Sequence, residues 1–343
     1  MQQSSEVLFL LCETPLHAGS GSDLGLIDLP IQRERHTGFP KVEGSSLKGA
    51  LREAFEKSKK ADKTARNHEI MVHRIFGYDD TNAHEVVKRN PRFLNQEDQQ
   101  FRGCLTVTDC RLLLFPVKSQ KGVCVWITCP RVVTKFCNEM AQIEQNEMAQ
   151  IEQNEMAQIE QKVTFEIKAD TASSNLSLID DKVGIEEFIY GGIKVEEATT
   201  NFAEHIAKQF FPKNDYMYNL IKNNVVVLPD NDFAQLTELC TEVITRTKIN
   251  NTTGTVAQGQ LFNEEYLPQE TILYSLVLFE NEFAKEDTAN AKKEKPKTFE
   301  EVKQFYEKHL PQHFQLGGNA TIGKGIVKTN LKSPKTQTQE NAN

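Results

Sequence analysis

The sequence lacks a long hydrophobic run, and nothing at its start resembles a secretory leader. A helix that crosses a bilayer needs about eighteen consecutive apolar residues, and no stretch of the 343 residues approaches that length. The first residues, MQQSSEVLFLLCETP, contain neither a basic segment nor a small-residue cleavage site. The sequence therefore predicts a cytoplasmic protein.

Paired cysteine motifs are missing as well. The seven cysteines form no C-x-x-C pair, and their odd number argues against a disulfide framework. The spacing of Cys124 and Cys129 fits no known set of zinc ligands. We therefore expect buried thiols and no structural metal.

Excess positive charge, which marks many nucleic-acid-binding chains, is absent from the total, because the formal net charge is −8. The acidity is concentrated in residues 138–161, which read NEMAQIEQ three times and hold six glutamates without a cation. A period of eight turns an α-helix by about 80° per copy, so the methionines and isoleucines of the repeat share no single stripe. We expect a dispensable acidic surface insertion.

A basic region contrasts with this insertion. Residues 29–60 contain eight lysines and arginines but only four glutamates. Such a local excess favours an anionic ligand, although a solvated helix face would look similar. Lys48 lies near the start of a helix predicted over residues 46–60, which Ser45 or Ser46 can cap. The helix dipole disfavours a cation at that end unless an anion compensates it.

The rest of the chain predicts both strands and helices. Apolar runs at residues 7–13, 104–117 and 122–130 are typical of strands, and the last two are expected to form a hairpin. A late helix should begin after Thr298, which has capping-box spacing to Glu301. We therefore expect an α+β fold with helices on one face of the sheet.

Glycines gather near the carboxyl terminus in LGGNATIGKG. The stretch from Gly318 to Lys324 matches the phosphate-loop pattern G-x-x-x-x-G-K, but Gly325 replaces the required serine or threonine and a strand is expected next. An NTPase site is therefore not predicted. The loop could still cradle a phosphate with backbone N–H groups, or could form a plain tight turn, and the sequence leaves both readings open.

Two segments hold candidate chemical groups. Asp28 precedes Pro30 in a predicted irregular loop, where a lone aspartate commonly forms a turn. Beside an RNA phosphate, the same carboxylate could instead take the 2′-hydroxyl proton or hold a divalent metal. His17 could assist, or could be structural. Residues 243–279 predict two long strands around a turn, and the protruding ribbon would carry Phe262, Glu264, Glu265 and Tyr266.

Three stretches together resemble the RAMP superfamily: TPLHAGSGSDLGLIDLPIQRERHTGFPKVEGSSLKGALR, TGTVAQGQLFNEEYLP and LGGNATIGKG. The likeness runs in order from Leu8 to about Lys328 and is strongest to the backbone subunits of type III-B CRISPR Cmr effector complexes. It implies one domain over residues 1–330, with a ferredoxin-like or RRM-like palm, inserted fingers and a β-hairpin thumb at about 247–270. The acidic repeat departs from the pattern, as does the tail at 331–343, which is expected to be disordered.

The resemblance also implies partners and an activity. Copies of the chain would stack head-to-tail on crRNA with other Cmr subunits and would cleave target RNA at regular intervals, leaving a 2′,3′-cyclic phosphate and a 5′-hydroxyl. A divalent metal, Mg²⁺ or Mn²⁺, and no organic cofactor would be needed. Asp28 is the implied catalytic residue and the candidate metal ligand, with weaker supporting roles for His17 and Glu265. The implied RNA-binding residues are His17, Arg33, Arg35, Lys48, Gly317, Gly318 and Lys324.

Two other functions are consistent with parts of the sequence. In one, the chain is a non-catalytic module that binds crRNA, and Asp28 only shapes its loop. In the other, the isolated chain processes guide precursors without metal. That activity needs a histidine together with a tyrosine or lysine cluster, which is not apparent in the sequence.

Overall fold

The computed structural model describes residues 3–22, 25–58, 64–79, 100–151, 165–250, 252–282 and 296–332. Within these residues, one mixed sheet of thirteen strands contains segments from both ends of the chain. Its main path runs in the order β11 (Lys194–Val195), β8 (Thr171–Ala172), β12 (Val225–Val227), β7 (Val123–Thr128), β6 (Cys110–Ser119), β15 (Ile272–Glu280), β1 (Gln3–Cys12), β17 (Ile326–Lys332) and β16 (His313–Gln315).

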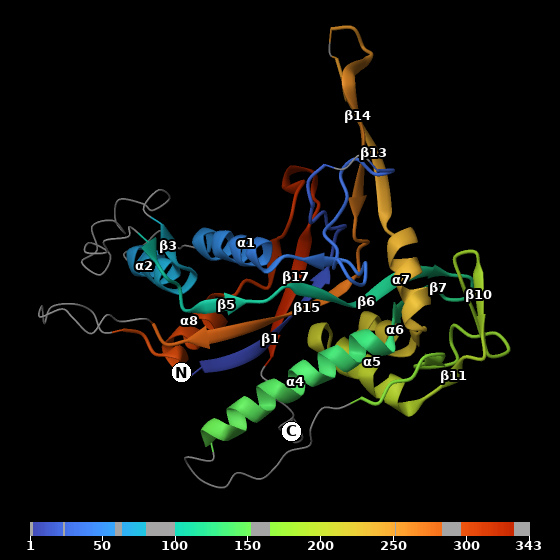
Figure 1. Ribbon diagram of the computed structural model, residues 1–343, viewed down its shortest axis with the longest axis horizontal. Coiled ribbons are helices and arrows are strands. Elements are labelled where there is room, and N and C mark those ends of the chain that lie inside the picture. The colour runs from blue at the N-terminus through green and yellow to red at the C-terminus, as the bar shows by residue number, and fades with distance from the viewer. Residues whose placement is uncertain are drawn as a thin grey trace, which may run out of the picture.

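Shorter strands pair at the sides of this path. β2 (Lys41–Val42) and β9 (Lys182–Ile185) pair with β6, β5 (Leu105–Val107) pairs with β15, and β10 (Phe188–Gly191) pairs with β9. Two strand pairs lie outside the sheet: β3 (Tyr78–Asp79) with β4 (Gln100–Phe101), and the hairpin of β13 (Glu242–Ile249) with β14 (Val256–Tyr266). The hairpin of β13 and β14 protrudes from the body as a long ribbon, which we call the thumb (Figure 1).

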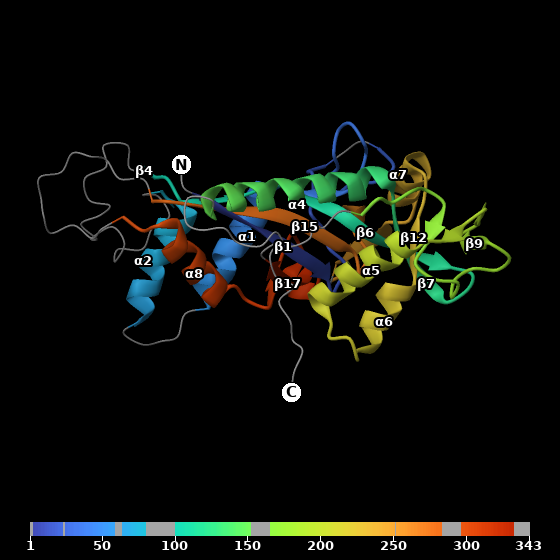
Figure 2. The ribbon, with the colours of Figure 1, turned by 90° about the horizontal axis from the view of Figure 1, so that it is seen from below.

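Helices cover both faces of the sheet, so the prediction of a single covered face is wrong. On one face, Phe9 of β1 contacts Phe136 and Phe210. On the other, Phe279 of β15 contacts Tyr306. Figure 2 shows one of these helices, α4, lying along the sheet. The helices are α1 (Gly44–Lys57), α2 (Thr64–Phe76), α4 (Pro130–Ile151), α5 (Glu197–Phe210), α6 (Tyr216–Asn223), α7 (Asp230–Leu239) and α8 (Phe299–His309).

The predicted α+β class is confirmed, and most predicted elements are present. The apolar run at 7–13 lies largely in β1, the hairpin forms from β6 and β7, and α8 carries the full capping box between Thr298 and Glu301. A strand, β17, follows the glycine-rich loop, so the helix that a phosphate loop requires is absent there. The run at 104–117 is divided, because β5 and β6 are separate strands.

The start of α1 differs from the prediction. The helix begins at Gly44, and neither Ser45 nor Ser46 caps it, because the preceding Glu43 is the N-cap residue and makes no side-chain cap. Instead, the carboxylate of Asp109 accepts a hydrogen bond from the Gly44 N–H at 2.9 Å. A residue distant in sequence thus satisfies an amide that the first turn leaves free.

The acidic repeat begins inside the core. Its first copy lies in α4, and Met140 and Ile143 are buried at 5% and 3% exposure. A surface insertion can therefore begin no earlier than the second copy, and residues 152–161 lie outside the described residues. The predicted tail also starts later than expected, because β17 continues to Lys332; residues 333–343 are not described.

Five of the seven cysteines are buried, as predicted, and Cys124 and Cys240 are half-buried. Burial raises the pKa of the Cys12 thiol to about 12, which suits an inert core residue. In the part of the chain that the structure describes, no helix is long and apolar enough to span a membrane.

Candidate functional site

Asp28 lies at the base of the thumb. Its loop runs beside β14, where Leu29 forms a parallel bridge with Glu264 and its N–H donates to the carbonyl of Asn263 at 3.0 Å. The Oδ2 atom of Asp28 accepts a hydrogen bond from the Asn263 N–H at 2.7 Å. The side chain is exposed, and among the described residues its second oxygen has no hydrogen-bond partner. The structure thus fixes one carboxylate oxygen and presents the other to solvent.

Glu264 points to one side of β14 into a buried polar network. Its Oε1 atom accepts a hydrogen bond from Asn319 Nδ2 at 2.6 Å, and its Oε2 atom accepts one from the Tyr266 hydroxyl at 2.6 Å. Arg246 Nε lies 2.6 Å from Oε2, and His17 Nε2 lies 3.6 Å from Oε1. The Arg246 guanidinium also donates to the Tyr266 hydroxyl. The network joins both thumb strands to the glycine-rich loop.

Two pKa shifts follow from this network. Burial alone would raise the pKa of the Glu264 carboxyl, but the hydrogen bonds from Tyr266 and Asn319 and the nearby His17 and Arg246 hold it below its usual value. For Tyr266, burial and the hydrogen bond to Glu264 raise the pKa to about 12. Glu264 is therefore ionised and Tyr266 protonated at neutral pH.

Glu265 points to the opposite side of the same strand, as alternation along a strand requires. Arg33 Nη2 donates to its Oε1 atom at 2.5 Å, and the Thr241 hydroxyl donates to the same oxygen at 2.8 Å. The Ile31 N–H donates to Oε2 at 2.9 Å. Glu265 is 2% exposed, so it holds the loop after Asp28 against the thumb and does not project from it.

The buried positions of Glu264, Glu265 and Tyr266 correct the prediction that the protruding part of the ribbon carries them. All three are at most 4% exposed and lie at the thumb base. Phe262 lies two residues closer to the thumb tip than Glu264 and is half-buried. The exposed apolar side chains of the thumb are instead Val243, Ile249, Val256 and Leu261.

His17 is also buried, at 9% exposure. Its Nδ1 atom lies 2.7 Å from the Glu265 carbonyl oxygen, and its own carbonyl accepts the N–H of Gly318 at 2.8 Å. Both ring nitrogens therefore face protein groups. The geometry favours the structural alternative for His17 over a direct contact with RNA, and it places the ring in the Glu264 network rather than beside the exposed oxygen of Asp28.

The glycine-rich loop is a close-packed turn. Gly317 has a φ of +76°, and a Cβ built there would lie 2.3 Å from the His17 carbonyl oxygen, so no other residue fits without a shift. The N–H of Gly325 donates to the Pro15 carbonyl, and those of Gly323 and Lys324 donate within the loop. Because these N–H groups already donate to protein carbonyls, the structure favours a tight turn over a phosphate cradle. The Lys324 amine lies 4.9 Å from the centre of the Tyr266 ring.

The predicted RNA-binding cations differ in their surroundings. Arg33 is engaged internally, because besides Glu265 it donates to the carbonyls of Gly38 and Thr237. Lys48 donates to the Leu105 carbonyl at 2.8 Å, and burial lowers the pKa of its amine. Arg35 is exposed and has no ion pair with any described residue.

A match to the RAMP superfamily model covers residues 9–328. The chain belongs to the RAMP superfamily. Within it, this RAMP protein is 35% identical over 324 residues to the CRISPR system Cmr endoribonuclease Cmr4 of Pyrococcus furiosus, covering 93% of this chain and 92% of that relative.

Solved structures agree with this assignment. The crystal structure of oligomeric Cmr4 from Pyrococcus furiosus matches this RAMP chain with a TM-score of 0.60 and 29% identity, over 96% of this chain and 99% of that one. A chain of the type III-B Cmr-beta complex bound to cognate target RNA matches with a TM-score of 0.61 and 21% identity, over 95% of this chain and 96% of that one. The second likeness supports the fold alone.

Sequence reasoning missed part of the thumb-base machinery. Asn263 holds Asp28 through its backbone, which leaves no signal in residue type. Asn319 has a φ of +65°, and its side chain bridges Glu264 and Tyr266. Asparagine tolerates this left-handed conformation better than most residues, and its position between glycines was the one available clue.

Proposed function

We propose that this RAMP protein is an RNA-cleaving backbone subunit of a type III-B CRISPR Cmr complex. Several copies would bind crRNA head-to-tail with other Cmr subunits and cut complementary target RNA at regular intervals. The observation that carries the proposal is the Asp28 carboxylate, fixed through one oxygen at the thumb base and open to solvent at the other. The cytoplasmic location expected from the sequence remains a prediction.

The proposed chemistry uses the 2′-oxygen of the target RNA as the nucleophile. In A-form RNA this oxygen is not aligned with the leaving 5′-oxygen, and a thumb that displaces a nucleotide would release that constraint. Asp28 would then accept the 2′-hydroxyl proton or orient the phosphate. The buried contacts of Glu264 and Glu265 would hold the thumb and the Asp28 loop in fixed relation.

A divalent ion fits this arrangement with Asp28 as its protein ligand. The described residues contain no group of three or more histidine, cysteine, aspartate or glutamate side chains that could hold a metal by themselves. Mg²⁺ commonly binds through one or two carboxylates together with substrate phosphates, which matches a single exposed carboxylate. When bound, such an ion would stabilise negative charge on the phosphate.

The test compares wild type, Asp28→Ala and Asp28→Asn in the assembled ribonucleoprotein. Asp28→Asn keeps an oxygen that can accept the Asn263 N–H, so it removes the charge while preserving the loop. Both variants should bind target RNA normally and cut it at least about 100-fold more slowly, as for loss of a general base. Cutting at the wild-type rate would refute the role of Asp28. If the wild-type complex with Mg²⁺ or Mn²⁺ leaves bound target intact, the non-catalytic alternative is correct.

A further inference from the structure

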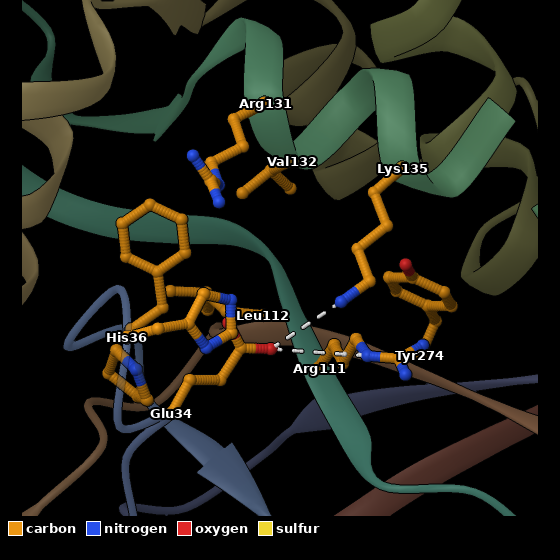
Figure 3. A pocket seen from close by; sticks show the side chains of 10 residues that line it. Glu34, His36, Arg111, Leu112, Arg131, Val132, Lys135 and Tyr274 are labelled. Atoms are coloured by element: carbon orange, nitrogen blue, oxygen red, sulfur yellow. Dashed lines mark ion pairs between the residues drawn. The ribbon is translucent and has the colours of Figure 1, made fainter. Parts of the chain in front are cut away.

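A pocket of about 90 Å³ lies outside the Asp28 site. It opens between the loop that follows Arg33, the start of β6 and the first two turns of α4 (Figure 3). No local sequence pattern predicts this pocket, because its lining residues come from four separate segments of the chain. The acidic and basic side chains of the lining are Glu34, His36, Arg111, Arg131 and Lys135.

Positive charge exceeds negative charge in this pocket. Arg111 is compensated, because its Nη1 atom lies 2.6 Å from Glu139, just outside the lining. Glu34 is shared, at 3.8 Å from Lys135 and 4.0 Å from Arg111, and is the one acid in the lining. The guanidinium of Arg131 has no side-chain partner among the described residues. The lining thus holds three cations, Arg111, Arg131 and Lys135, against the single carboxylate of Glu34, which pairs with Lys135.

The walls and the rim differ in character. Tyr274 lines the pocket from β15 at 1% exposure and forms part of a fixed apolar wall with Leu112 and Val132. At the rim, Lys135 is 42% exposed and Arg131 is also exposed. Figure 3 shows both side chains extending from α4 toward the loop with Glu34. An arginine fork beside a lysine is well suited to a phosphate.

The pocket is tied to the Asp28 loop. Between Asp28 and Glu34 the chain advances six residues, which span at most about 20 Å. Glu265 fixes this stretch through Ile31 and Arg33, so the pocket and the exposed carboxylate keep a constant separation. A single RNA strand that passes Asp28 can therefore reach the pocket. The short and fixed separation between Asp28 and the pocket favours RNA over an acidic protein segment as the ligand of the pocket.

We propose that the pocket of Arg131 and Lys135 binds a backbone phosphate of the target RNA strand. The identity of that strand rests on the function proposed above, in which Asp28 acts on the target. The pocket would set the position of the strand relative to Asp28 through contacts that carry no base information.

The experiment measures target binding and not cleavage, so its result is independent of the test of Asp28. Complexes that carry Asp28→Ala are compared with and without Arg131→Gln and Lys135→Gln, and target affinity is followed across a salt series. Each lost phosphate contact should reduce the slope of log affinity against log salt by about 0.7 per copy of the chain. The control pair, Lys182→Gln with Lys213→Gln, removes the same charge at exposed positions elsewhere.

The expected result is a smaller slope for the α4 pair and an unchanged slope for the control pair. Equal slopes in all complexes, or the same decrease in both pairs, would overturn the proposal. Loss of complex assembly by the α4 pair would assign the pocket to a protein partner and would overturn the proposal as well. Failure of wild type to cut RNA would refute the catalytic function without changing this readout.

Discussion

Glu264 and Glu265 are neighbours in the sequence, yet they hold the thumb in different ways. Glu264 faces the glycine-rich loop and is surrounded by Tyr266, Asn319 and Arg246. Glu265 faces the loop that carries Asp28, and Arg33 is its ionic partner. Both carboxylates are nearly inaccessible, at 4% and 2% exposure.

The comparison shows how one strand can fix two loops at once. Alternation along β14 sends consecutive side chains to opposite sides, so the thumb base is clamped between segments far apart in the chain. The Glu264 side uses neutral donors as well as an arginine, whereas the Glu265 side depends on one ion pair with two added hydrogen bonds. The two sides should therefore respond differently to substitution.

The largest effect is expected on the Glu265 side. Arg33→Met removes the ionic partner and a hydrogen-bond donor of a buried carboxylate, and should lower the free energy of unfolding by about 2–3 kcal/mol. Arg35→Met, two residues away at an exposed and unpaired position among the described residues, should change it by less than about 0.5 kcal/mol. Urea denaturation of both variants checks this. Equal stability of the two would contradict the clamp at Glu265.

A smaller effect is expected from the glycine-rich loop on the Glu264 side. Gly317 and Gly323 have similar φ values, +76° and +74°, but a Cβ at Gly317 would meet the His17 carbonyl, whereas one at Gly323 would meet nothing within 4 Å. Gly323→Ala should therefore cost about 1 kcal/mol from backbone strain alone. Gly317→Ala should cost about 1 kcal/mol more, since atoms must also shift. Thermal unfolding measures the difference, and equal losses would show that the loop is not tightly packed on His17.

The smallest effect concerns acid pH. The pKa of Glu264 in the folded protein is below its ordinary value of 4.5, so its ionisation stabilises the fold above that value and the contribution is lost as the pH falls through the folded pKa. Glu264→Gln should therefore flatten the decline in stability below about pH 4.5, because the variant has no carboxyl to protonate there. Denaturation at pH 7 and at pH 3.5 tests this, with the exposed Glu187→Gln as the control. A decline as steep as that of wild type would assign the acid sensitivity to other groups.

The sequence predicted the elements better than their arrangement. Apolar alternation and the capping box at Thr298 located β1 and α8, because those signals are local. The predicted cap of α1 was wrong because Asp109, in the link between β5 and β6, binds the first amide of the helix. The site shows the same division: the sequence motif predicted an irregular loop at Asp28, but the contacts that bury His17 and engage Arg33 come from distant segments.

The sequence by itself determined the α+β class, the protruding hairpin, the family resemblance and the candidate acid at position 28. Those features depend on local pattern and on residue identity. Only the tertiary structure decided which polar groups are buried and which remain exposed. It directed Glu264 and Glu265 to opposite loops and left one oxygen of Asp28 without a hydrogen-bond partner among the described residues. It also brought Arg131, Lys135 and Glu34 into the lining of one pocket. Burial and pairing depend on contacts between segments up to hundreds of residues apart, which no local pattern records.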